Sequence, residues 1–231
     1  MTASIREVLV IPNGSTSQQI VTTGAGTQSG DTLVVIQSTD NNAVTAASAA
    51  NATLTQVGTD AADGNSAGVL RLLAGNTTSG GAGNITFPNA GGADLYGVVL
   101  VMTGSVTVEG FVKSAVGSSA TSHTTPATTG LSGAADLLVS IGQNNQGTTW
   151  DLTGSGLTSR GQVTTAFGAL YVATTALAAT GVSPTYTVAT VAGAKPAFIT
   201  VGLDDGAAPP AAHARTWTVA PSLAAVQRAS W

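Results

Sequence analysis

Three groups of residues have types and spacings that could perform chemistry. Residues 64–68 read GNSAG and match the G-x-S-x-G motif, in which a sharp turn from a strand into a helix exposes a nucleophilic serine. Here a polar loop precedes Ser66 and an apolar strand pattern follows it, so a hairpin loop is the better interpretation. The glycines at 24, 26 and 30 have one residue too many for a dinucleotide fingerprint, and they precede a strand pattern instead of following one.

The acidic and histidine residues give weak signals for a metal site. Asp60, Asp63 and Asn65 lie close together in the sequence, but their spacing does not match a calcium loop, so solvated turns are expected. His123 and His213 each lie in a loop with no second ligand nearby. The sequence therefore predicts no catalytic centre, no metal and no cofactor, and the protein is expected not to be an enzyme.

One aromatic residue suggests carbohydrate binding. Trp150 follows Asn144 and Asn145 in a polar stretch, and an exposed tryptophan flanked by amides can stack on a sugar ring. The alternative is that Trp150 lies in the core, which is the more common place for a tryptophan. The sequence leaves both interpretations open.

Composition limits the elements that can position these residues. The 231-residue chain has 8% charged residues, 4% aromatic residues, 29 glycines and no cysteine. A chain rich in Ala, Gly, Thr and Val with so few charges suits strands and tight turns better than amphipathic surface helices. The net charge of −4 disfavours nucleic acid as a partner, and no apolar run is long enough to span a membrane. The expected place of folding is the cytoplasm.

Apolar segments recur in the same order along the chain. The densest, residues 93–104 (ADLYGVVLVMTG), has a counterpart at 197–203 (AFITVGL). Four further segments have counterparts between 100 and 105 residues later, so two pseudo-repeats are predicted at about 30–104 and 135–203. Their short strands and turns predict an all-β fold, an antiparallel β-sandwich of jelly-roll type. The pairing also aligns Asp31 with Asp136, each expected in a turn before a strand.

Further predictions concern the regions outside the repeats. Residues 1–29 are expected to form an N-terminal strand or arm and a loop, and 30–205 the sandwich body. Residues 107–113 are expected to form an edge strand, 114–133 a long surface excursion, and 43–52 and 175–179 single helical turns.

Residues 206–231 are predicted to be a C-terminal arm. A Pro/Ala linker that includes Pro209 and Pro210 should be extended, and the tail beyond it is rich in large apolar groups. Trp and Arg are common in interface hot spots, which predicts an assembly element. The arm docks either on its own body or on another chain, and its candidate interface residues are Arg215, Trp217, Val219, Leu223, Val226, Arg228 and Trp231.

The chain resembles jelly-roll proteins of tailed-bacteriophage virions, such as head-decoration, minor tail and spike proteins. The resemblance rests on residues 30–36 (GDTLVVI), 95–104 and 135–141 (ADLLVSI), each set between Thr/Ser/Gly loops. It implies a non-enzymatic virion protein that decorates or cements a capsid or tail surface, made and assembled in the cytoplasm of the bacterial host. Its partners would be copies of itself and other virion proteins. The alternative is a carbohydrate-binding module that recognises the host surface.

Overall fold

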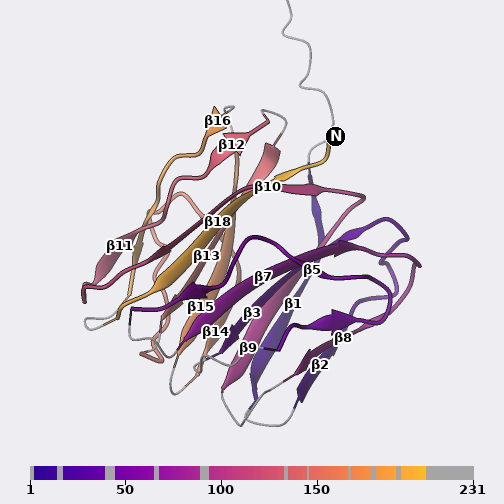
Figure 1. Cartoon of the computed structure of the whole chain (residues 1–231), viewed down its shortest axis with the longest axis horizontal. Coiled ribbons are helices and arrows are strands. Elements are labelled where there is room, and N and C mark those ends of the chain that lie inside the picture. The colour runs from indigo at the N-terminus through magenta and orange to yellow at the C-terminus, as the bar shows by residue number, and fades with distance from the viewer. Residues whose placement is uncertain are drawn as a thin grey trace, which may run out of the picture.

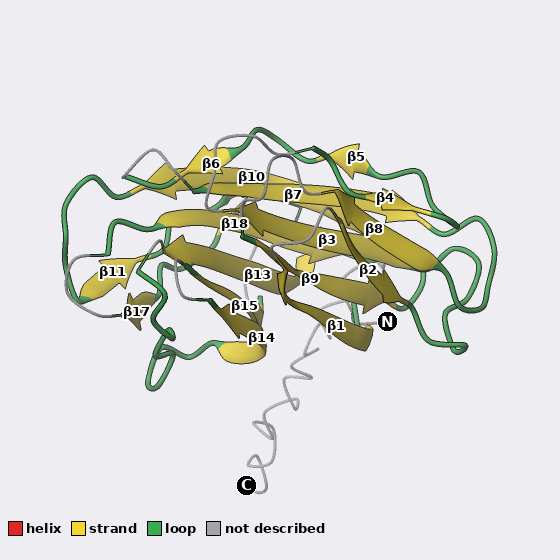
Figure 2. Cartoon of the chain, turned by 90° about the horizontal axis from the view of Figure 1, so that it is seen from below, coloured by secondary structure: helices red, strands yellow, loops and turns green. Residues whose placement is uncertain are grey.

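The computed structural model describes residues 3–14, 18–39, 45–64, 68–88, 94–132, 135–144, 146–165, 168–177, 181–190 and 194–206. The described chain contains strands, turns and loops but no helix, which confirms the all-β prediction (Figure 2). The strands are β1 (Ile5–Gly14), β2 (Gln18–Thr22), β3 (Thr32–Thr39), β4 (Ser48–Ala49), β5 (Thr55–Gln56), β6 (Ala61–Ala62), β7 (Val69–Asn76), β8 (Asn84–Pro88), β9 (Leu95–Met102), β10 (Thr107–Ala115), β11 (Ser122–Thr124), β12 (Thr129–Leu131), β13 (Ala135–Asn144), β14 (Thr158–Thr164), β15 (Ala169–Ala176), β16 (Gly181–Val182), β17 (Thr187–Ala189) and β18 (Ala197–Asp204).

Two large antiparallel sheets contain the equivalent strands in the same order. The first sheet has the order β1-β9-β3-β7-β5, with β6 also paired to β7, and the second has the order β10-β18-β13-β15-β14. In Figure 1 the strands of the first sheet lie at the lower right and those of the second at the upper left. The strongest apolar segments of the sequence, β9 and β18, are interior strands of their sheets.

The strand registers agree as well as the strand order. Thr32 pairs with Asn76 and Met102 in the first sheet, and Leu137 pairs with Ala176 and Leu203 in the second. These offsets of 105, 100 and 101 residues persist along the three strands. They make Gly68 the counterpart of Gly168, and they extend the repeat to include β1 and β10, which pair with β9 and β18.

The two sheets pack face to face and form an antiparallel β-sandwich, as predicted. The core between them contains alternate side chains of both sheets, because successive residues of a strand point to opposite faces. Its fully buried members include Val34, Ile36, Val98 and Leu100 from the first sheet and Val139, Ile141, Val172, Ile199 and Val201 from the second.

An approximate two-fold axis, parallel to the strands, relates the two repeats. Strand β1 lies against β14 at one edge of the sandwich, and β6 lies against β10 at the other, so the strand orders run in opposite directions. Strands β3 and β13 end at the same end of the sandwich, where Gln143 Nε2 lies 3.4 Å from the carbonyl oxygen of Thr39. The repeats therefore meet as two subunits of an isologous dimer do, within one chain.

Small outer layers cover the other face of each sheet. Strands β2, β8 and β4 form a sheet whose Ile85 and Phe87 pack on Leu33, Val99 and Leu73 of the first large sheet. On the second large sheet, Trp150 and Val188 pack against Tyr171 and Phe198. The central strands β3, β9, β13, β15 and β18 are therefore buried on both faces over most of their length.

The structure corrects three of the finer expectations. The described part of 43–52 contains strand β4 and a turn, and Thr175 and Ala176 end strand β15, so the described residues of these segments do not form the predicted helical turns. Residues 114–132 contain strands β11 and β12 and bury His123 and Leu131, because this stretch covers the second sheet. Leu137, in the apolar segment 135–141, is expected from the sequence to be a buried strand residue but is only partly buried.

Candidate functional site: two seams between the repeats

The serine motif does not have the geometry of a hydrolase elbow. Ser66 lies outside the described residues, but Gly64 follows strand β6 and Gly68 precedes strand β7. The motif therefore joins two strands, whereas the elbow requires a helix after the serine. An added Cβ at Gly68 would lie 2.0 Å from Gln143 Nε2, so this glycine allows the two repeats to approach closely.

Trp150 is a core residue, which corrects the sugar-stacking hypothesis. Its side chain is 2% exposed, and its ring makes edge contacts with Tyr171 and Phe198 at centroid distances of 5.0 and 5.7 Å. The indole Nε1 donates a hydrogen bond of 3.2 Å to the carbonyl oxygen of Ala169. Asn144 is also buried, and Asn145 lies outside the described residues. No face of this tryptophan is open to a sugar.

His123 belongs to the same aromatic cluster. Its ring lies 6.4 Å from that of Trp150 and 6.3 Å from that of Phe198, and Nε2 lies 3.1 Å from the carbonyl oxygen of Ala120. Burial lowers the pKa of His123, and the contact with Ala120 opposes the shift. His213 lies outside the described residues.

Two acids, Asp60 from the sequence analysis and Asp204 at the end of β18, are used as structural groups. Asp60 accepts hydrogen bonds of 2.8 and 2.6 Å from Arg71 Nε and Nη2, and this ion pair raises the pKa of Arg71. Asp204 accepts hydrogen bonds from Ser132 Oγ and from the backbone N–H of Gly206. Within the described ranges, no group of three His, Asp or Glu side chains could hold a metal ion.

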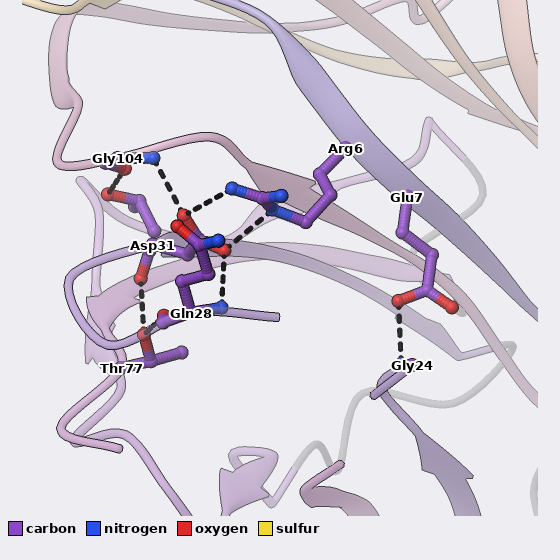
Figure 3. Close-up of polar contacts among 8 residues, drawn as sticks. Arg6, Glu7, Gly24, Gln28, Asp31, Thr77 and Gly104 are labelled. Atoms are coloured by element: carbon purple, nitrogen blue, oxygen red, sulfur yellow. Dashed lines mark hydrogen bonds and ion pairs between the residues drawn. The ribbon is translucent and has the colours of Figure 1, made fainter. Parts of the chain in front are cut away.

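Asp31 forms a polar centre that the sequence did not reveal (Figure 3). Its side chain accepts hydrogen bonds of 2.8 Å from the backbone N–H groups of Gln28 and Gly104 and pairs with Arg6 at 2.8 Å. Burial alone would raise the pKa of Asp31, but the two N–H groups and the guanidinium together lower it. Arg6 is the extra residue of a bulge in β1, between Ile5 and Glu7, and bulges commonly redirect a side chain in this way.

The first seam, where β1 meets β14, is closed. Val10 and Val98 pack over Gly161, where an added Cβ would lie 3.1 Å from a methyl carbon of each valine. Strand β14 continues from Thr158 to Thr164 along this edge, with a one-residue bulge at Arg160. The two sheets therefore come together here with side chains filling the gap.

The second seam, where β5 and β6 face β10, is open. Residues 57–60 interrupt the strand that would correspond to β14, and Phe111 packs over Gly58 at the interruption. A hollow lies on each side of it. The near hollow, about 310 Å³, is lined by Thr32, Thr55, Gln56, Val57, Ala74, Gly75, Asn76, Val106 and Val108. The far hollow, about 320 Å³, is lined by Asp60, Ala61, Ala62, Lys113, Ser114 and Ala115.

The open seam offers apolar contact and hydrogen bonds. Its hollows are at the lower end of the roughly 300–1,000 Å³ that ligand pockets span. Their lining consists mostly of small apolar and neutral polar residues, with Asp60 and Lys113 at one end. This chemistry suits the large side chains of a polypeptide segment.

The remaining sequence-predicted site residues cannot be placed. The seven candidate interface residues of the C-terminal arm, from Arg215 to Trp231, lie outside the described residues. Comparisons with family models, curated proteins and solved structures give no match for this chain. No helix in the described part of the chain is long and apolar enough to span a membrane.

Proposed function

We propose that this protein is a non-enzymatic structural component of a bacteriophage virion that decorates or cements the surface of the capsid or the tail. The observation that carries the proposal is the strand order of the first repeat. In the first repeat β1-β9-β3-β7 form one sheet and β2-β8-β4 form the sheet behind it. This is the arrangement expected of a jelly roll, an architecture common in viral capsid proteins.

The use of polar groups inside the fold also supports a structural role. Asp31, Asp60, His123 and Trp150, which have the side chains best suited to chemistry or recognition, are engaged in contacts that join strands and layers. Covered sheets and a repeat joined within one chain make a compact building block. Its partners are copies of itself and other virion proteins, and its place is the virion, assembled in the cytoplasm of the bacterial host.

Immunogold electron microscopy tests the proposal. Antibodies raised against the purified protein should label phage particles from lysates of the bacterium that carries the gene, with regular labelling of the head or the tail. Label that stays in the cell fraction, with none on purified particles, would contradict the proposal. A glycan array addresses the alternative, a carbohydrate-binding module, for which specific binding to one glycan class is the expected result.

A further inference from the structure

We propose that the C-terminal segment, residues 207–231, of one copy binds in the open seam of a second copy and seats its tryptophans in the two hollows. This inference rests on the proposed function, because it supplies the contact by which copies associate. The groove and the segment are both parts of this chain, so the contact needs no other protein.

The described chain ends one strand away from the open seam. Asp204, near the end of β18, pairs with Thr107, and the neighbouring Val106 and Val108 line the near hollow. The 25 residues after Gly206 can span about 80 Å at roughly 3.3 Å per residue. Strand β10, which forms one wall of the seam, has nine residues and a length of about 30 Å. The segment is therefore long enough to reach a neighbouring body and follow its whole seam.

The linker favours binding of the segment to the seam of a second copy over binding to the seam of its own chain. Residues 206–214 contain Pro209 and Pro210 among alanines, a composition that favours an extended chain of about 3.1 Å per residue. Nine such residues span about 28 Å, nearly the length of β10. Trp217 would then lie well beyond the near hollow of its own body, and binding there would require the chain to turn back.

The chemistry of the segment complements the seam. Each hollow has room for one large side chain, and the segment has two tryptophans, at 217 and 231. Thr55 and Asn76 line the near hollow and can accept a hydrogen bond from an indole N–H, while Val106 and Val108 offer apolar contact.

Filling the hollows in the full-length chain tests the proposal. Thr55 and Ala62 are exposed at the near and far hollows, so T55W and A62W occupy the space without changing the core. Sedimentation velocity should show concentration-dependent association of the native protein, weakened at least tenfold by T55W together with A62W. The control V182W adds the same bulk at a residue 57% exposed on β16 and should associate as the native protein does. A native chain that stays monomeric, or unchanged association of the filled variant, would overturn the proposal.

Disulfide crosslinking separates binding to a second copy from binding to the same body. The chain has no cysteine, so single-cysteine variants report one contact each. Mixing T55C or A62C with T216C or S230C should give a disulfide-linked heterodimer for at least one pair. If the disulfide forms only within a single chain that carries both cysteines, or in no combination, the proposal is wrong. Immunogold labelling of particles is independent of this result, so failure here would leave the proposed function standing.

Discussion

The two repeats differ most clearly in their fifth strand. In the second repeat β14 is one strand from Thr158 to Thr164 with a one-residue bulge at Arg160, whereas the first repeat has the short strands β5 and β6 with residues 57–60 between them. Both are paired to the same kind of neighbour, β15 in one case and β7 in the other, in the corresponding register. The repeats therefore agree in their central strands and differ at the edge, where the difference creates a groove.

The outer faces of the two large sheets show a second difference. A phenylalanine ring fills the space between sheet and covering layer in both repeats, but it comes from different strands. In the first repeat the covering strand β8 supplies Phe87, which lies over Gly97 of the main sheet. In the second repeat the main sheet supplies Phe198, and the covering strand β17 has the smaller Val188. Each repeat therefore places one phenylalanine between its main sheet and its covering layer, although a different strand supplies it. This is expected because protein interiors are closely packed.

The largest expected effect tests the covering layer of the second repeat. Trp150→Ala removes a buried ring that contacts Tyr171 and Phe198, so the free energy of unfolding should fall by about 3–5 kcal/mol. Urea denaturation followed by circular dichroism measures it. Trp150→Phe keeps a ring in the cluster and should cost much less. A loss below about 1 kcal/mol for the alanine variant would show that this layer does not depend on Trp150.

The next effect tests the polar centre, which belongs to the first repeat. Asp31→Asn replaces an acceptor of several charge-assisted hydrogen bonds and should cost about 1.5–3 kcal/mol at neutral pH. Glu7→Gln is the matched control, because an amide oxygen can still accept from the backbone N–H of Gly24 and the loss should be smaller.

The same centre predicts a dependence on pH. The pKa of Asp31 is below its ordinary value of 3.8 in the folded protein, so the carboxylate stabilises the fold above that value. This contribution is lost as the pH falls through the lowered pKa of the folded state. When the free energy of unfolding is measured as a function of pH, it should therefore fall more steeply near and below pH 3.8 for the native protein than for Asp31→Asn. Equal slopes would place the acid sensitivity elsewhere.

A smaller effect tests the interruption of the fifth strand. Asp60→Asn removes the ion pair with Arg71, but the Asp60 side chain is 33% exposed, so the expected loss is at most about 1 kcal/mol and decreases with added salt. Equilibrium unfolding at low and high salt measures it. A loss above about 2 kcal/mol would show that the interruption is fixed by this pair.

The smallest expected effect is a pH dependence of the free energy of unfolding that arises from His123, in the second repeat. Burial lowers the pKa of His123, so the unfolded chain binds a proton more readily than the folded one near the ordinary value of 6.5. The free energy of unfolding should therefore decrease as the pH falls below about 6.5. His123→Gln keeps a donor for the carbonyl oxygen of Ala120 and should flatten this slope. An unchanged slope would exclude His123 as its source.

The sequence was sufficient to predict the strands of the large sheets. Segments such as 31–37 and 138–141 are buried on both faces, so their continuous apolar runs identify them without knowledge of their partners. The recurring order of segments came from the same signal. Strand β1 was recognised as a strand, but its place in the sheet was not, because its partner β9 lies some 90 residues later.

The details of the candidate sites were beyond the sequence because they depend on contacts between distant residues. Trp150 has the same neighbours in the sequence whether it is exposed or buried, and only the positions of Tyr171 and Phe198 decide between the two. Asp31 was expected in a turn, but its pairing with Arg6 depends on a one-residue bulge in β1. The open seam arises where β10 meets β5 and β6, and no local pattern marks such a meeting.

The order of the repeats along the chain has a consequence for synthesis. All strands of the first sheet precede residue 103, so this sheet can form before the second repeat has been made. At roughly 5–20 residues per second, the ribosome takes about 5–20 seconds to supply the next hundred residues. During that interval Val34, Ile36, Val98 and Leu100 have no covering sheet. Two nascent chains on one messenger RNA would then expose identical apolar faces to each other. The misassembly expected of this architecture is a domain swap, in which the second repeat of each chain covers the first repeat of the other.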